Sequence, residues 1–186
     1  MRHPIPTAGR REIGARAIQR RLGVLSIICL AGVGCSTTGN ASVTFTDDGR
    51  LFSVELPRPP TRSEDTVPAS LGEVLFVTYT AETKEALVIV STTDFPKPLP
   101  EDAEGPPFLD AVAETSALAL QGTIQSTTDI TFSGHPGKDV VIARPVGTAF
   151  QRILIVGNRL YSLRATSGLG GRPPAYDRML ETFTLL

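Results

Sequence analysis

The sequence predicts an α+β domain with a central antiparallel sheet of about six to eight strands and two helices. Short runs of β-branched and aromatic residues follow one another through tight connections, which favours antiparallel pairing. Only two segments have helical spacing, and they stand between groups of strands instead of alternating with every strand, as they would beside a parallel sheet. The chain has 186 residues, of which 41% are hydrophobic and 20% charged. This composition is typical of one globular domain.

The first 34 residues have the order of a secretory signal peptide. Residues 1–21 are positive, residues 22–33 are apolar and uncharged, and Gly34, Cys35 and a short polar stretch follow. An apolar run of about a dozen residues is shorter than the roughly 20 that a membrane-spanning helix needs. We therefore expect residues 1–34 to be a signal peptide. The alternative is a short buried helix of the folded domain.

Cys35 stands where a bacterial lipoprotein signal carries its lipidated cysteine. The residues Gly32-Val33-Gly34-Cys35 resemble the short box of that family, although Gly32 replaces the usual Leu. The resemblance implies that Cys35 receives a diacylglycerol on sulfur and becomes the first mature residue. The protein would then be exported and anchored in the cell membrane or outer membrane, facing the periplasm or the exterior. The alternative is ordinary cleavage near Ala41, which would release a soluble secreted domain.

The cysteine count agrees with a lipid anchor. The chain has two cysteines, and Cys29 would be removed with the signal peptide. Cys35 is then a lone thiol in an exported protein, which implies a free, intermolecular or modified cysteine. The mature chain cannot form an internal disulfide, so its hydrophobic core must stabilise the fold alone.

The charge of the mature chain excludes some partners. Residues 1–34 contain six Arg and one Glu, which leaves 12 basic and 18 acidic residues and a net charge of −6 for residues 35–186. An acidic body argues against a nucleic-acid partner, which needs clustered Lys and Arg, and it does not suit an anionic membrane surface. We expect membrane contact through the lipid anchor and a protein partner in the envelope.

The domain is predicted to begin after a short tether. Residues 35–42 are small and polar, as in flexible linkers, and residues 43–186 form the expected single domain. Alternating residues predict a hairpin over residues 43–56, with its turn at Asp48-Gly49. Residues 57–72 are rich in Pro and charge and are predicted to be a loop.

The middle of the chain is predicted to contain two central strands and the longer helix. Residues 73–80 and 86–92 are apolar on both faces, which predicts strands covered on both sides. Residues 94–107 hold five prolines and are expected to be irregular. The spacing of residues 108–121 predicts a helix with Pro107 in its first turn, Asp110 favourable to its dipole there, and an end at Gly122.

A strand meander and a second helix complete the prediction. A short helix is predicted for residues 174–183, with a turn and an edge strand as the alternative. Gly137 is expected in a turn with positive φ, so that valine would strain the backbone there. The strands of the meander are residues 123–133, 138–144, 148–156 and 159–166.

Residues 51–186 resemble the Mog1/PsbP-like family of small α+β domains. The resemblance implies this fold, and because bacterial members are often exported lipoproteins it agrees with Cys35. The family has no common enzymatic activity, so the resemblance implies a non-enzymatic binding or assembly module and transfers no catalytic residue. The matching segments are FSVELP at 52–57, GHPGKDV at 134–140, RILIVGNRLYSLRA at 152–165 and LETFTL at 180–185.

We find no catalytic, cofactor-binding or metal-binding constellation in the sequence. His135 is the one histidine of the mature chain; its functional interpretation is a base oriented by Asp139, or one metal ligand. A zinc site needs about three or four protein ligands, and the mature chain has no second histidine and no free cysteine to supply them. We expect an exposed turn residue, and an enzyme with an unrecognised carboxylate or His135 site is the alternative function.

Other patterns have simpler structural interpretations. The acidic groups at 47–48 and 101–104 lack the spacing of a calcium loop, and the glycines at 168–171 lack a phosphate-binding motif. The three tyrosines, Tyr79, Tyr161 and Tyr176, have the positions of core-edge residues. A deep pocket of polar side chains would favour an enzyme, whereas a shallow apolar groove would favour a binding module.

Overall fold

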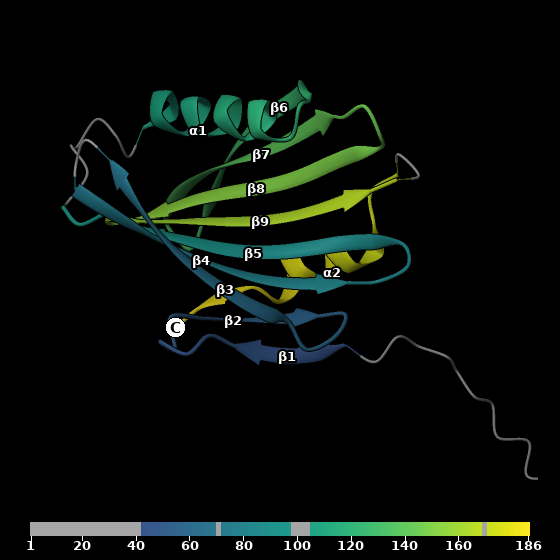
Figure 1. The fold of residues 1–186 in the computed structure, drawn as a ribbon, viewed down its shortest axis with the longest axis horizontal. Coiled ribbons are helices and arrows are strands. Elements are labelled where there is room, and N and C mark those ends of the chain that lie inside the picture. Colours follow the sequence, from purple (N-terminus) through teal and green to yellow (C-terminus); the bar gives the residue numbers. More distant parts are fainter. Residues whose placement is uncertain (1–41, 70–71, 98–104, 169–170) are drawn as a thin grey trace, which may run out of the picture. The chain divides into compact units, whose positions relative to one another are not determined.

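The computed structural model describes residues 42–69, 72–97, 105–168 and 171–186. The predicted signal peptide, Cys35 and most of the tether lie outside these residues. The described residues belong to one compact unit, and none of their helices is long and apolar enough to cross a membrane. The predicted α+β class is confirmed, with two helices and a seven-stranded antiparallel sheet (Figure 1).

The seven-stranded sheet is built from two meanders that meet at one strand pair. The first contains β3 (Thr61–Ala69), β4 (Gly72–Glu82) and β5 (Ala86–Asp94). The second contains β6 (Thr123–Phe132), β7 (His135–Ala143), β8 (Thr148–Val156) and β9 (Arg159–Ser167). The order across the sheet is β3-β4-β5-β9-β8-β7-β6, and every neighbouring pair is antiparallel. The pairing of β5 with β9 therefore joins the two meanders.

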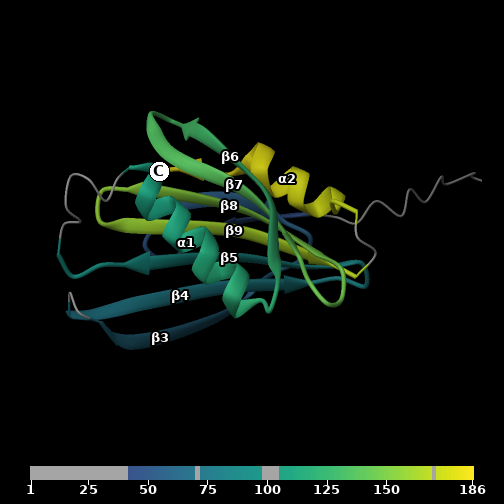
Figure 2. The ribbon, with the colours of Figure 1, turned by 90° about the horizontal axis from the view of Figure 1, so that it is seen from above.

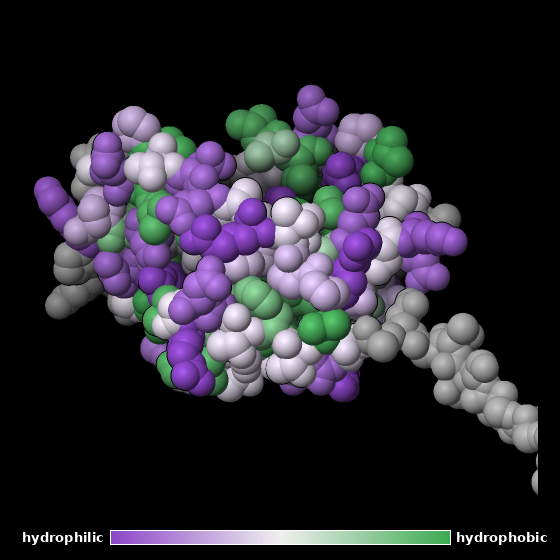
Figure 3. Space-filling model, turned by 60° about the horizontal axis from the view of Figure 1, so that its bottom comes forward, coloured by the Kyte–Doolittle hydropathy of each residue, from purple (hydrophilic) through white to green (hydrophobic). Residues whose placement is uncertain are grey.

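A small sheet and a helix cover one face of the large sheet. The small sheet has the order β1 (Val43–Thr46), β2 (Phe52–Leu56) and β10 (Thr184–Leu185), and α2 (Pro174–Thr182) lies beside it. Its inner residues Phe52, Val54 and Leu56 are buried against the large sheet, as the hairpin alternation predicts. From this side, hydrophilic and hydrophobic residues are mixed over the surface (Figure 3).

Among the described helices and strands, only α1 (Pro106–Ala119) packs on the other face of the large sheet. Leu109, Ala113 and Ala117 of this helix pack on buried residues of β7 and β8, in a second core. Pro106 and Pro107 occupy the first turn, where a missing N–H costs nothing. Asp110 lies beyond that turn and instead binds the Lys138 ammonium at 2.6 Å, so its expected role at the helix dipole is wrong.

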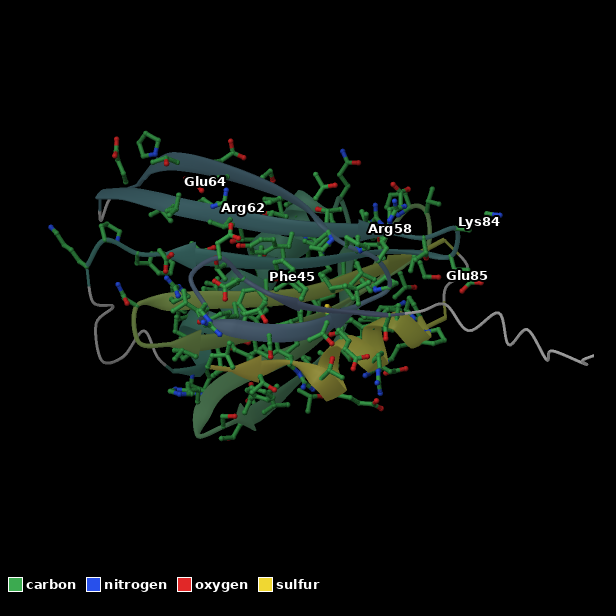
Figure 4. The ribbon with its side chains drawn as sticks, turned by 90° about the horizontal axis from the view of Figure 1, so that it is seen from below. Phe45, Arg58, Arg62, Glu64, Lys84 and Glu85 are labelled. Carbon is green, nitrogen blue, oxygen red and sulfur yellow. The ribbon has the colours of Figure 1, made fainter. Side chains whose placement is uncertain are left out.

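The prediction of a loop over residues 57–72 is wrong, because β3 occupies residues 61–69 of it. β3 pairs with β4 only and forms the edge of the sheet. An edge strand tolerates charge and proline, since one of its sides needs no hydrogen-bonded partner. Arg62 and Glu64 form an ion pair along it (Figure 4), and this polar sequence hides the strand from a hydrophobic pattern.

The predicted turn at residues 135–137 is also misplaced. The β6–β7 hairpin turns at Ser133 and Gly134, whose φ angles are 50° and 83°, as in the two-residue turns that match strand twist. His135, Pro136 and Gly137 already belong to β7. Gly137 does not have a positive φ, so the expected backbone strain is not the reason for glycine there.

Candidate functional site

His135 and Asp139 do not form the pair considered from the sequence. Both lie on β7, where four residues span about 13 Å along the strand. The Asp139 carboxylate instead accepts two hydrogen bonds from the Arg152 guanidinium, at 2.7 and 2.8 Å. Opposite His135 in the hairpin is Phe132. The structure therefore gives His135 no orienting carboxylate from Asp139.

The acidic groups of the sequence have structural partners where they are described. Asp47 accepts hydrogen bonds from the backbone N–H groups of Gly49, Leu51 and Phe52, at 2.6 to 3.1 Å, and closes the β1–β2 turn. Asp48 pairs with Arg62 at 3.2 Å. Residues 101–104 lie outside the described residues. Within the described ranges, no three His, Cys, Asp or Glu residues group as metal ligands.

The tyrosines lie within the core, deeper than the core-edge positions expected from the sequence. Tyr79, Tyr161 and Tyr176 are all buried, and Tyr79 and Tyr161 contact the Phe52 ring edge-on. Of the glycine segment at 168–171, the structure describes only its two ends. The next residue, Arg172, binds Asp177 and lies over the Tyr176 ring at 5.0 Å.

A first hollow lies where the domain begins. It has a volume of about 280 Å³ and is lined by residues of β2, the start of α2 and the β4–β5 turn. The Glu55 carboxylate in it accepts hydrogen bonds from Arg178 at 2.8 and 3.1 Å and from Ser42 at 2.8 Å. These bonds lower the pKa of Glu55. In this hollow, Glu55 and Arg178 are thus already paired with each other.

A second, larger hollow lies between α1 and the strands β3, β4, β5 and β9, and we call it the α1 groove. Its volume is about 520 Å³, within the range of pockets that hold small molecules. Figure 2 looks onto this face and shows α1 crossing the sheet obliquely, with β3 clear of the helix. Two of its apolar residues, Phe76 and Val67, are 38% and 45% exposed. The apolar lining residues are Val67, Val74, Phe76, Phe95, Phe108, Ala111, Val112, Ala119 and Leu160.

Strand register arranges the floor of the α1 groove in three rows that run across the strands. The first contains Arg164 of β9, with Gln151 of β8 opposite it. The second, two residues along the strands, is a row of hydroxyl groups from Thr78, Ser91 and Ser162. The third is more apolar and consists of Phe76, Thr93 and Leu160. The groove therefore changes from charged to apolar along its length.

The polar end of the α1 groove contains buried groups without partners. The Gln151 side chain is 3% exposed; its amide nitrogen donates to the hydroxyls of Ser162 at 2.8 Å and Ser116 at 3.2 Å. Its amide oxygen and the Nε of Arg164 are buried without any hydrogen-bond partner. Buried polar groups in proteins are nearly always paired, so two orphans in one place need an explanation.

Arg164 also differs from Arg152 and Arg159 of the same sheet, because no ion pair joins it to a carboxylate of the described residues. Arg152 binds Asp139 and Arg159 binds Asp94, and these contacts raise the pKa of both guanidinium groups. Burial, and secondly the charge of Arg144, lower the pKa of Arg164. Arg164 is the single charged residue among those that line the groove. Among the described lining residues, the groove thus has one partly desolvated positive charge and no acid to balance it.

Sequence reasoning missed the α1 groove, although one signal was present. In the predicted strand at 159–166, Leu160, Ser162 and Arg164 alternate with Tyr161 and Leu163. An arginine within a central strand is unusual, because both faces of such a strand are covered. The pattern could have marked Arg164, but it could not show that α1 leaves this part of the sheet open.

The chain has few matches among known proteins. No protein-family model and no curated protein matches it. Solved structures do match. One is the crystal structure of PA94, a protein of unknown function from Pseudomonas aeruginosa. It is 16% identical, with a TM-score of 0.30, and the match covers 69% of this chain and 85% of that chain. A TM-score this low supports no argument about function.

Proposed function

We propose that this protein is an exported, lipid-anchored bacterial envelope protein whose Mog1/PsbP-like domain is a non-enzymatic binding module. In this proposal the α1 groove is the binding surface. One observation carries it: α1 covers only part of its face of the sheet and leaves a mainly apolar groove in which Phe76 and Val67 are partly exposed. Exposed apolar surface of this kind is typical of interaction and ligand sites.

Cys35 is the anchor in this proposal. The order of positive, apolar and small residues before it supports lipidation. A single acyl chain holds a protein only marginally, whereas the two or more chains of a bacterial lipoprotein make attachment essentially permanent. The acidic mature chain adds no attraction to anionic lipid. Membrane association then depends wholly on Cys35.

The anchor can be tested by metabolic labelling with a palmitate analogue. We expect label in the wild type and none in Cys35→Ala, which stays as an uncleaved precursor or is cut downstream and released. An unlabelled wild type whose mature N-terminus lies near Ser42 would overturn lipidation and leave a freely secreted domain.

The groove can be tested with tryptophan reporters, because the chain contains no Trp. Ala111 lines the α1 groove, whereas Leu118 is exposed on the same helix and is not among its lining residues. We expect dodecanol, an uncharged apolar probe, to shift the emission of the Ala111→Trp variant to shorter wavelength. The emission of Leu118→Trp should not change. Equal responses from the two variants would contradict binding in the groove.

A further inference from the structure

We infer that the α1 groove binds a single-chain aliphatic carboxylate, with the carboxylate at Arg164 and the chain directed toward Leu160 and Phe108. This inference rests on the proposed binding function of the groove and adds the chemical class of its ligand. The two hollows described above differ in whether their arginine already has an acidic partner. Arg178 in the first already holds Glu55 at hydrogen-bond distance, whereas Arg164 in the α1 groove has no acid among its lining residues.

Charge complementarity selects an anion. Arg164 is the only charged residue among the described residues that line the groove, and its Nε is buried without an acceptor. The nearby Arg144 also has a buried Nε without an acceptor, and its like charge further disfavours an empty site. A carboxylate would accept the hydrogen bonds that the Arg164 guanidinium lacks, in the fork geometry that arginine offers. One lining charge matches one carboxylate.

Gln151 supports the same ligand. Its amide nitrogen and the hydroxyls of Ser116 and Ser162 lie within hydrogen-bond distance. Rotating the amide by half a turn lets both hydroxyls donate to its oxygen and leaves the nitrogen free to donate. The amide nitrogen and oxygen have nearly the same size, so this rotation needs no extra space. A carboxylate beside Arg164 would accept this free N–H, and both orphans of the groove would then be satisfied.

The order of the rows selects a chain rather than a compact anion. Arg164 and Leu160 are four residues apart on β9, about 13 Å along the strand. Between them, on the groove side, lies Ser162 in the hydroxyl row, and beyond Leu160 the groove is bounded by Phe95 and Phe108. A small anion would fill only the charged end. An aliphatic chain would also bury the apolar end, where each methylene removed from water adds affinity.

The test is calorimetric titration of the unlipidated full chain, carrying Cys35→Ala, with three ligands that share one chain. These are dodecanoate and dodecyltrimethylammonium, each below its micelle concentration, and dodecanol below its solubility limit. Because a charge-assisted hydrogen bond outweighs a neutral one, we expect dodecanoate to bind at least about tenfold more tightly than dodecanol. The cation should bind most weakly. Because this order of affinities is measured with the groove residues unchanged, it does not depend on how a substitution in the groove affects folding.

Two arginine variants test whether Arg164 is responsible for the preference for dodecanoate over dodecanol. Arg164→Gln should bring the affinities for dodecanoate and dodecanol to within about threefold of each other, because only the charged contact is lost. Arg58→Gln is the matched control. Arg58 is exposed in the loop between β2 and β3, near Lys84 and Glu85 (Figure 4), and this variant should keep the wild-type ratio.

The outcomes separate this inference from the function on which it rests. If dodecanol binds in the groove and dodecanoate binds no more tightly, the carboxylate is wrong and the binding module stands. If Arg164→Gln keeps the full preference for dodecanoate, the assignment to Arg164 is overturned. If none of the three ligands binds, both the ligand class and the proposed use of the groove fail.

Discussion

Gly137 allows a sharp test of the packing between β7 and β8. A Cβ at this position would lie 2.5 Å from the Cδ2 methyl of Leu154 and 2.7 Å from the backbone oxygen of Ile153. The methyl group can turn away, but the oxygen belongs to β8, which is paired with β7 on that side. Gly137→Ala must therefore push the two strands apart or distort their pairing. Overpacking of this kind costs about 1–3 kcal/mol.

The net effect of Gly137→Ala is smaller than the clash alone. Alanine restricts the unfolded chain more than glycine does, which stabilises the folded state by about 0.4–1 kcal/mol where the backbone angles are compatible. Gly137 has no positive φ, so this gain applies. We expect a net loss of about 1–2 kcal/mol, which lowers the urea midpoint by roughly 0.5–1 M for an m-value near 2 kcal/mol/M.

Gly168→Ala is the matched control for this experiment. Gly168 has no positive φ, and nothing lies within 4 Å of a Cβ built on it. Its urea midpoint should stay at the wild-type value or rise slightly. If the midpoints of Gly137→Ala and Gly168→Ala coincide, the steric reasoning is refuted. Gly137→Val should lower the midpoint further than alanine does, because its two added methyl groups enlarge the clash.

Two further predictions concern buried cations on the α1 face. The Lys138 side chain is 4% exposed and binds Asp110 and Asp129, each at 2.6 Å. Because both carboxylates are at least half exposed, Lys138→Met should lower the free energy of unfolding, measured in urea, by only about 1 kcal/mol. Hydrogen bonds to the two aspartates raise the pKa of Lys138, so its contribution should be complete below pH 10.5 and fall as the pH rises through the folded-state pKa. Arg164→Met, in contrast, should raise the free energy of unfolding by about 1 kcal/mol, since it removes a desolvated charge that Arg144 repels; a lower thermal midpoint would show that Arg164 has a stabilising partner.

Local sequence patterns predicted most of the strands because most strand pairs join neighbours along the chain through short turns. The strands β8 and β9 lie close to their expected bounds, since alternation and a Gly157-Asn158 turn are both readable over short stretches. The edge strand β3 was missed because its residues need only one pairing side and little burial. The position of the β6–β7 turn was missed because Gly134 and Gly137 are both plausible turn residues, and only the pairing of Ile130 with Gly137 decides between them.

The α1 groove was beyond such reasoning for a physical reason. Its floor combines Thr78, Ser91 and Ser162, which come from three strands and are brought into one row only by register. Its wall is a helix whose path across the sheet follows from packing of Leu109, Ala113 and Ala117 on β7 and β8. No continuous stretch of sequence contains a pattern that predicts either the row of hydroxyl groups or the part of the sheet that α1 leaves uncovered. The sequence could mark Arg164 as unusual, but not what surrounds it.

The β5–β9 pair is the single junction between the two meanders, and it determines when the groove can form during folding. Each meander pairs neighbours along the chain, whereas β5 and β9 bring together residues such as Asp94 and Arg159, which are 65 positions apart. Closing so long a loop is the entropically expensive step of assembly. The groove floor takes Ser91 from one side of this junction and Ser162 from the other, so neither half of the domain alone contains the complete groove. The complete groove would form only when the junction closes, and an occupant lying across the junction would hold the two halves together.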